Sequence, residues 1–463
     1  MQKSKKLGVE KISKLLFNLS APATIGMLVI ALYNIVDTIF VGRGVGTLAI
    51  AGVSVVFPIQ MIITTMGQTI GVGSASLISR FLGADDLKSA NRVFGNLLTL
   101  IFAFSFIIVC FGYIFIKPVL ILFGAQGEIY QSAYDYFIVL LPGLFLLNFA
   151  MAINNIIRAE GNAKHSMFSL LIAAIANIIL DPIFIFVFDL GVKGAAWATN
   201  VAQLFTFIYL LYYYKSGKSE LKFLFANLKL DKKITEETFA IGAASSVRHG
   251  AQGILSALLN NLLVVFGGEI AVAAFGIINR IMRVVFLPLI GIAQGFMPIA
   301  GFNYGAGNFK RVKKVFNTAS LWSTIFSLTC FFILFFFPTQ IMKIFSNDIQ
   351  LVELGSYALR IIILMLPIIG FQMIGGGYYQ AIGKAGQAMF LALLRQTIIL
   401  IPLILILPNL FGLNGIWYSF PIADLLSAII TVFVLLPEFK QLKKTDADFT
   451  KIENINSRNR SKK

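Results

Sequence analysis

The sequence predicts an all-α membrane protein with twelve transmembrane helices in two pseudo-symmetric six-helix bundles. Three observations support this fold class: an apolar composition, twelve apolar segments of membrane-spanning length, and an internal repeat. Hydrophobic residues make up 58% of the 463 residues, charged residues make up only 13%, and the mean hydropathy is +0.84. One soluble core does not account for such a composition, so we expect a multi-pass membrane protein.

About 20 consecutive apolar residues cross a bilayer as a helix, and this length divides the chain. The predicted spans lie at about 17–40, 52–78, 93–116, 130–156, 165–188, 193–214, 239–266, 272–300, 315–337, 352–380, 387–407 and 413–436. The alternating ten-residue strands of a membrane barrel are not seen in the sequence. Helices are therefore expected to satisfy the backbone hydrogen bonds in lipid.

The chain repeats itself at a shift of 222 residues. This shift aligns FLGADDLKSANRVF (81–94) with NYGAGNFKRVKKVF (303–316), and a shift of 221 aligns LGVKGAAWATNVAQL (190–204) with FGLNGIWYSFPIADL (411–425). Each match is weak alone, but the matches occur in the same order in both halves of the chain. They therefore indicate two six-helix halves related by an axis along the membrane normal.

The repeat predicts four parts of the chain. They are an N-lobe at 1–214, a cytoplasmic linker at 215–238, a C-lobe at 239–436 and a basic cytoplasmic tail at 437–463. A cavity between two such lobes can open alternately to either side of the membrane, which is the architecture of a carrier.

The net charge is +17, and the basic residues are distributed along the chain as a membrane topology predicts. With both termini in the cytoplasm, the tails and inner loops hold 29 Lys and Arg residues, and the outer loops hold 4. This is the positive-inside bias of a plasma (inner) membrane protein, so we expect no nucleic-acid partner. The two cysteines, two histidines and absent nucleotide motif predict no cofactor and no metal beyond a possible Na⁺.

Asp37 and Asp181 are lone carboxylates in apolar, membrane-length stretches, LYNIVDTIFVG and IANIILDPIFIF. An ionisable group at this depth is costly and usually marks an ion or substrate path. Counting 1.5 Å per residue, Asp37 lies about 30 Å and Asp181 about 24 Å from the inner end of its span. The alternative is structural: Asp181 caps a helix end or pairs with a polar neighbour.

Several segments together resemble the multidrug and toxic compound extrusion (MATE) family. They are the 6+6 repeat, SAPATIGMLVIALYNIVDTIFVG in the first span, FLGADD, RAEGNAK and NIILDPIFIFVFDLGVKGAAWATNVAQ. The chain is most similar to the DinF-like branch and its MepA-like relatives. Unlike the NorM branch, it has no acidic residue in the middle of 239–266 or 352–380.

The resemblance implies that Asp37, Asn177, Asp181 and Thr199 form a cation-coupling site. Asn177 and Asp181 are four residues apart and share a helical face. Carboxylate, amide and hydroxyl oxygens suit Na⁺, and a desolvated carboxylate beside another suits H⁺, so the sequence leaves the ion open. The expected function is secondary active export of drugs or other small organic compounds by cation antiport through alternating access, by a monomer in contact with membrane lipid.

The predicted C-lobe spans carry five arginines, with Asp424 the one acid deep in that half. The candidate substrate-cavity residues are Asn34, Arg248, His249, Arg280, Arg283 and Arg395. Buried arginines need partners or water, and arginines that line a cavity would favour anionic or zwitterionic substrates. The alternative is that Arg360 or any of the others reaches an interface or pairs with Asp424 as a structural strut.

Two other functions stay open at this point. A flippase for lipid-linked saccharides or phospholipids would use cavity arginines for a phosphate headgroup. A membrane-embedded enzyme is disfavoured, because the sequence holds no paired acid and base and no nucleophile set.

Overall fold

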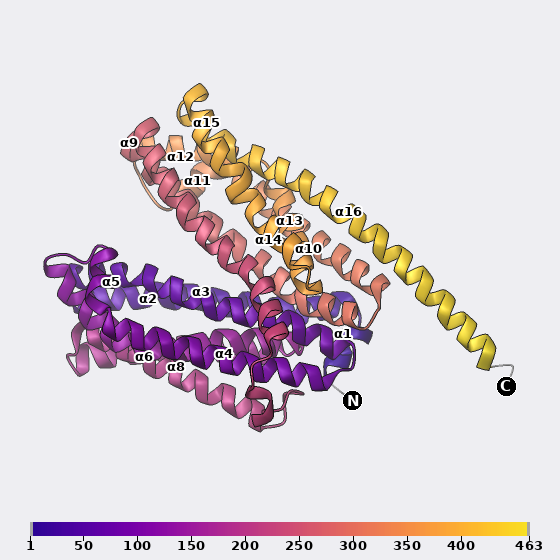
Figure 1. The fold of residues 1–463 in the computed structure, drawn as a ribbon. Coiled ribbons are helices and arrows are strands. Elements are labelled where there is room, and N and C mark those ends of the chain that lie inside the picture. The colour runs from indigo at the N-terminus through magenta and orange to yellow at the C-terminus, as the bar shows by residue number, and fades with distance from the viewer. Residues whose placement is uncertain (1–2, 461–463) are drawn as a thin grey trace. The chain divides into compact units, whose positions relative to one another are not determined.

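The computed structural model describes residues 3–460, with side chains from Ser4 to Leu442 apart from His249. The described chain is helical, with no strand in residues 3–460 (Figure 1). The end of the predicted basic tail, 461–463, and the side chain of His249 lie outside the described residues.

The first half of the chain forms the following elements. They are η1 (Lys3–Lys5), α1 (Lys6–Val9), α2 (Ile12–Gly44), α3 (Thr47–Gly83), α4 (Leu87–Ile114), α5 (Ile116–Leu122), α6 (Glu128–Ala159), α7 (Ala163–Pro182), the π-helical turn η2 (Ile183–Val187) and α8 (Gly191–Lys215).

The second half follows the short 3-10 turn η3 (Phe225–Leu228). Its helices are α9 (Lys232–Gly305), α10 (Phe309–Phe336), α11 (Pro338–Lys343), α12 (Ile349–Ile362), α13 (Leu366–Ile382), α14 (Ala385–Leu393), the π-helical η4 (Leu394–Leu400), α15 (Ile401–Phe411) and α16 (Leu413–Arg460).

The twelve predicted spans all have helical counterparts. Ten described helices are long and apolar enough to cross a membrane, and α12 with α13 form a further span bent by 52°. The 74 residues of α9 would extend about 110 Å if straight, which is far more than one bilayer. Gly268 breaks α9 with φ 66° and ψ −166°, between the predicted spans 239–266 and 272–300, so α9 supplies two spans. The predicted fold class is confirmed.

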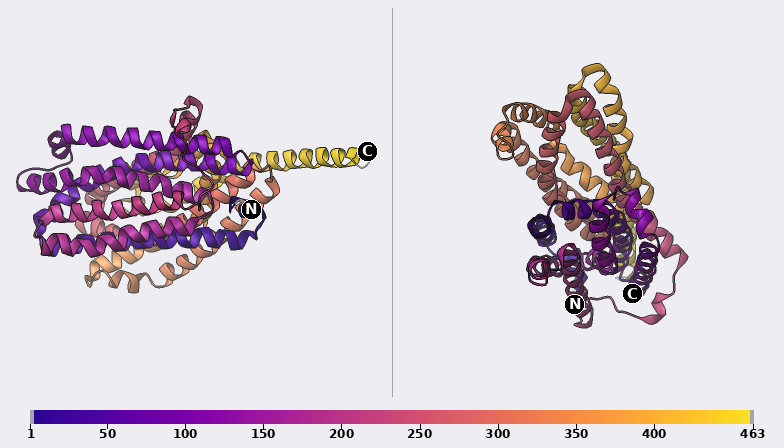
Figure 2. Two further views of the ribbon diagram at one scale, coloured as in Figure 1. Left: turned by 90° about the horizontal axis from the view of Figure 1, so that it is seen from below. Right: turned by 90° about the vertical axis from the view of Figure 1, so that its left-hand side faces the viewer.

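The described residues group into two compact units. Within residues 3–460, one unit contains residues 3–6 and Ala21–Ser246, and the other contains Leu7–Ser20 and residues 247–460. Three helices, α1, α2 and α9, therefore divide between the units. In the first unit α6 packs against α3, α4 and α8, and in the second α10 packs against α13 and α16. The helices drawn in indigo to magenta run alongside one another in Figure 2.

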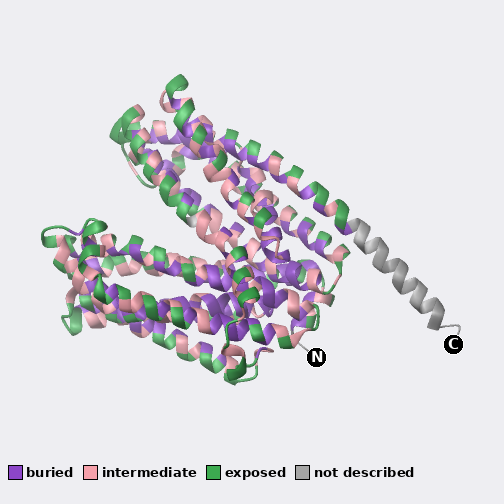
Figure 3. Cartoon of the chain, viewed as in Figure 1, coloured by how far each residue is buried: buried purple, intermediate pink, exposed green. Residues whose placement is uncertain are grey.

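Large apolar side chains are exposed along many helices, where green residues alternate with purple ones in Figure 3. Phe106 is 69% exposed and Phe433 68% exposed. Exposed apolar surface of this extent is expected where lipid replaces water. Between helices, small residues allow close approach: a Cβ on Gly143 in α6 would overlap Asn200 Oδ1 in α8.

Backbone geometry reproduces the internal repeat. Four pairs of residues with positive φ recur at shifts of 221 or 222: Gly46 and Gly268, Asp85 and Gly307, Gly161 and Gly383, and Gly191 and Gly412. The helix after the inner loop is capped alike in both halves. Asp86 Oδ1 accepts from the Ser89 N–H at 3.0 Å, and Asn308 Oδ1 accepts from the Arg311 N–H at 3.1 Å. Equal caps and turns explain why the repeat is visible in the sequence.

Candidate functional site

Helices α7 and α8 bring three of the predicted cation-site residues together. Asn177 and Asp181 on α7 are 2% and 0% exposed. Their spacing of four residues places both side chains on one face, and Asn177 Nδ2 donates to Asp181 Oδ1 at 3.3 Å. The same Nδ2 donates to Thr199 Oγ1 on α8 at 3.4 Å. One amide group thus links the carboxylate of α7 to the hydroxyl of α8.

Asp37 joins this cluster from α2. Its half-buried carboxyl group lies within hydrogen-bonding distance of the Asp181 carboxyl group. Two ionised carboxylates only accept hydrogen bonds, so this close approach requires a shared proton or a cation to offset their repulsion.

Three oxygens of the cluster lack a hydrogen-bond donor among the described residues. They are Asp37 Oδ1, Asn177 Oδ1 and Asp181 Oδ2, and all three are buried. A buried acceptor without a donor costs free energy, and a carboxylate without one costs more. Oxygen atoms from two carboxylates, an amide and a hydroxyl are hard ligands, so this donor set fits a proton or Na⁺.

Local packing holds α2 against α7 and its extension. The Phe40 and Phe186 rings meet edge to face at 6.4 Å, and a Cβ on Gly26 would lie 2.7 Å from Leu170 Cδ1. Directly after Asp181, Pro182 lacks a backbone donor, and the helix continues as the wider π-helical turn η2. The site acid therefore lies where the regular helix ends.

Two tyrosines near the cluster were not predicted. The phenol groups of Tyr33 on α2 and Tyr136 on α6 lie within electrostatic range of both Asp37 and Asp181. Tyr33 precedes Asp37 by four residues, so helical spacing could have identified it. Tyr136 is distant in sequence from the other members, and only the packing of α6 reveals it.

Asn34 was predicted to line the substrate cavity. The structure leaves its side chain exposed, and its Nδ2 donates to the Ile30 backbone oxygen of its own helix at 2.9 Å. No described contact joins Asn34 to the carboxylate cluster.

The arginines of the second unit separate into two groups. Arg395 forms an ion pair with Asp424, whose side chain is 1% exposed. Arg360 donates from Nε to the Phe335 backbone oxygen at 3.3 Å. The Arg395–Asp424 pair matches the structural alternative, in which a partner holds a buried charge. Arg360 is instead exposed.

The remaining arginines have no ion pair within the described residues. Arg280 and Arg283 on α9 are exposed. Arg248 is half-buried, with Nη2 3.8 Å from the position of a Cβ on Gly376. Arg280 and Arg283 lie three residues apart on one helical face.

Comparison with known proteins gives consistent matches along the chain. The family model MatE matches residues 22–183 and 251–406. The multidrug export protein MepA of Staphylococcus aureus (strain MRSA252) is 27% identical over 425 residues, which is 92% of this chain and 93% of that protein.

Solved structures agree with the fold. A crystal structure of MATE in the bent conformation superposes with a TM-score of 0.91 at 28% identity, covering 96% of this chain and 99% of that one. The MATE multidrug transporter DinF-BH, solved as a complex with a small molecule, has a TM-score of 0.85 at 42% identity, covering 94% of this chain and 98% of that one.

The likeness to MepA and DinF-BH confirms the branch that the sequence predicted. The matched residues include Asp37, Asn177 and Asp181. MATE proteins are transporters and not enzymes. This multi-pass membrane protein therefore belongs to the MatE family, the multidrug and toxic compound extrusion transporters.

Proposed function

We propose that the protein exports drugs or other small organic compounds in exchange for H⁺ or Na⁺, by alternating access of its two lobes. The observation that carries this proposal is the buried oxygen cluster of Asp37, Asn177, Asp181 and Thr199. The names of MepA and DinF-BH, which describe multidrug export and transport, support the class of substrate.

The cluster suits reversible cation binding for a physical reason. A cation or proton between Asp37 and Asp181 neutralises part of their repulsion and satisfies oxygens that otherwise lack donors. Release of that cation leaves the two carboxylates facing each other, which favours a different packing of α2 and α7. A ligand shifts a conformational equilibrium only through such differential binding.

The charge pattern of the loops supports a topology. The excess of Lys and Arg in one set of loops supports cytoplasmic N- and C-termini and insertion in the plasma membrane. The transporter acts as a monomer, with an N-lobe at 1–214 and a C-lobe at 239–436 joined by the linker 215–238.

The substrate is recognised by the second unit. The exposed Arg280 and Arg283 have no ion-pair partner among the described residues, and their guanidinium groups would attract an anionic or zwitterionic compound. The same arginines favour the second candidate function, a flippase for lipid-linked saccharide or phospholipid, whose phosphate headgroup they would bind.

Cell-based dye efflux separates the two functions. The protein and its Asp37→Asn variant are expressed at equal membrane levels in bacteria that lack their own exporters, and the cells are loaded with a cationic dye and with a zwitterionic dye. We expect the wild-type protein to lower the retained dye and Asp37→Asn not to do so. Retention unchanged by either protein, together with movement of a fluorescent phospholipid across proteoliposomes, would contradict export and support the flippase.

A further inference from the structure

The linker between the two halves is fixed against α4 by buried polar groups of that helix. Asn96 is 0% exposed, and its Nδ2 donates to the backbone oxygens of Asn227 at 3.3 Å and Lys229 at 3.1 Å. Its Oδ1 accepts from the Asp231 N–H at 2.6 Å. One turn further along α4, Thr99 Oγ1 donates to the Leu228 oxygen at 2.7 Å. These bonds hold η3 at a defined level on α4.

That level is the edge of the hydrocarbon layer. Residues 97–116 contain no charged side chain, and a stretch of about 20 such residues spans the apolar core of a bilayer. Arg92 precedes this stretch and Lys117 follows it. Asn96 therefore marks one boundary, which the positive-inside count assigns to the cytoplasmic leaflet, and η3 lies at the height of the lipid headgroups.

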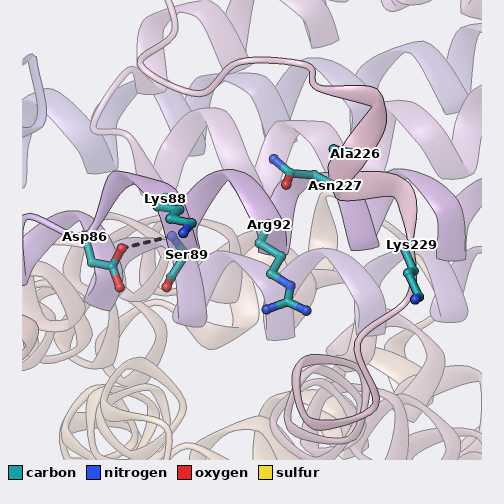
Figure 4. A pocket seen from close by; sticks show the side chains of 7 residues that line it. All are labelled: Asp86, Lys88, Ser89, Arg92, Ala226, Asn227 and Lys229. Atoms are coloured by element: carbon teal, nitrogen blue, oxygen red, sulfur yellow. Dashed lines mark hydrogen bonds between the residues drawn. The ribbon is translucent and has the colours of Figure 1, made fainter.

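A cavity of about 490 Å³ opens between α4 and the fixed linker. Figure 4 shows Lys88, Ser89 and Arg92 on α4 along one side and Asn227 and Lys229 on the linker along the other. The cavity thus gathers three basic side chains from two separate segments.

The charge of this cavity is positive. Its one acid, Asp86, accepts from the Ser89 N–H at 3.0 Å as the cap of α4, and this hydrogen bond with Ser89 lowers the pKa of its carboxyl group. Outside the cavity, Asp231 pairs with Arg92 at 3.0 Å. Lys88 and Lys229 form no ion pair within the described residues. Two ammonium groups are thus available for an anion.

Exposed aromatic side chains adjoin this cavity along the linker. Phe223 is 50% exposed and Phe225 is 79% exposed, and their rings meet edge to face at 4.9 Å. Leu224 and Leu230 are 48% and 49% exposed. Large apolar residues are unfavourable in water, but aromatic rings at headgroup level are favourable at a membrane interface.

We propose that the cavity of Lys88, Arg92 and Lys229 binds the phosphate of an anionic phospholipid from the surrounding bilayer, with Phe223 and Phe225 inserted beside its acyl chains. The two lysines supply charge, and the Ser89 hydroxyl and Asn227 amide supply neutral hydrogen bonds to phosphate oxygens. The lipid would fasten the linker, and with it the connection between the halves of the chain, to one leaflet.

Lipid retention by the full-length protein tests this assignment. The purified protein is reconstituted with equal amounts of phosphatidylglycerol and phosphatidylcholine and re-extracted in detergent, and native mass spectrometry counts the lipids retained. The wild-type protein should preferentially retain phosphatidylglycerol. Retention should fall about fivefold for each lysine removed in Lys88→Gln and Lys229→Gln, since each basic side chain near an anionic surface contributes about that factor.

A matched control removes the same charge beside the cavity. Lys232 and Lys233 are exposed residues at the start of α9 that do not line it, and Lys232→Gln with Lys233→Gln should leave phosphatidylglycerol retention unchanged. Phe223→Ser with Phe225→Ser should weaken retention without a change of charge. Size-exclusion profiles identify any variant that fails to fold. If the variant that carries both Lys88→Gln and Lys229→Gln fails to fold, the single Lys229→Gln variant replaces it.

Four results would overturn the proposal. Equal losses in the cavity and control variants would mean diffuse surface attraction. Unchanged retention in the Lys88→Gln and Lys229→Gln variant would exclude the cavity. Displacement of the lipid by millimolar inorganic phosphate would assign the cavity to a soluble anion instead. Full retention by the aromatic variant would exclude the insertion of Phe223 and Phe225 beside the acyl chains.

Discussion

Asp37 and Asp181 illustrate what single residues of this sequence reveal. A carboxylate in an apolar span is conspicuous because its burial is costly, and both acids are predicted as site residues on that ground. Asn177 was implied by the resemblance to the MATE family, and its spacing of four residues from Asp181 agrees with that assignment. Tyr136 was not predicted, because α6 reaches the cluster only through tertiary packing. The sequence therefore predicted the site residues that have an unusual carboxylate or a family match, and it missed a tyrosine that only the packing of α6 brings to the cluster.

Thr199 provides a neutral oxygen, and its removal should separate affinity from rate. Thr199→Ala deletes the hydroxyl that accepts from Asn177 Nδ2 at 3.4 Å but removes no charge. We expect apparent cation affinity to fall severalfold, by about 1 kcal/mol of one hydrogen bond, with the maximal export rate less affected. Export measured across a series of cation concentrations gives both quantities. A cation dependence equal to wild type would exclude Thr199 as a ligand.

The arginines of the second unit should show two different phenotypes. Arg395→Ala leaves Asp424 buried at 1% exposure without its ion-pair partner, which typically costs about 3–5 kcal/mol. Folded protein should therefore decrease and all substrates should be affected together. Arg280→Ala removes an exposed arginine and should instead alter which compounds are exported, with anionic and zwitterionic ones lost first.

Export per amount of folded protein, measured over a panel of compounds, distinguishes these phenotypes. If Arg280→Ala depresses every compound equally after this scaling, the arginine is not a substrate residue. Sequence alone could not sort the arginines, because each lies in an apolar span and only the contact with Asp424 sets Arg395 apart.

At the scale of elements, the inner end of α6 is tied to the linker by one buried carboxylate. Glu160 is 1% exposed and accepts from Ser219 Oγ at 2.5 Å, from the Glu220 N–H at 2.8 Å and from Tyr213 Oη at 3.2 Å. Glu220 in turn accepts from the Ser4 N–H at 2.5 Å. The network thus joins the α6–α7 turn, the linker and the N-terminal segment within one unit.

Burial raises the pKa of Glu160 from 4.5 to about 7, although the hydrogen bonds from Ser219, Glu220, Leu221 and Tyr213 oppose the rise. The folded protein therefore holds a proton that the unfolded chain loses between pH 4.5 and about 7. Stability contributed by this group is fully present below pH 4.5 and decreases as pH rises to about 7, by at most about 3 kcal/mol.

Glu160→Gln should flatten that dependence, because the amide does not titrate. Thermal unfolding midpoints of the purified protein between pH 5 and pH 7.5 test this, with Glu236→Gln on the exposed start of α9 as the control. An equally steep decrease in Glu160→Gln and wild type would assign the pH dependence to other groups.

Helix positions were predictable and the conformation of the linker was not. Apolar stretches of bilayer length located every span, and the break at Gly268 lies between two of them. The stretch 215–238 was expected only as a polar connection. Its position on α4 depends on the side chains of Asn96 and Thr99, which are ordinary helix residues in the sequence.

At the scale of the whole molecule, the internal repeat and the two compact units divide the chain at different residues. The repeat follows chain order, whereas the units place Leu7–Ser20 with the second half of the chain. As a result α2, which carries Asp37, has residues in both units. In the function that we propose, a cation bound between Asp37 and Asp181 would therefore act on a helix that has residues in both units.

Transport in proteoliposomes under imposed gradients tests the central claim, that the Asp37 and Asp181 carboxylates couple a cation to export. Wild-type protein should move a cationic or a zwitterionic dye when a H⁺ or Na⁺ gradient is imposed and stop when it is collapsed. Asp37→Asn and Asp181→Asn should each abolish this gradient-driven movement while inserting and folding normally, because an amide cannot supply the negative charge. Normal gradient-driven transport by both variants at equal protein levels would contradict the account.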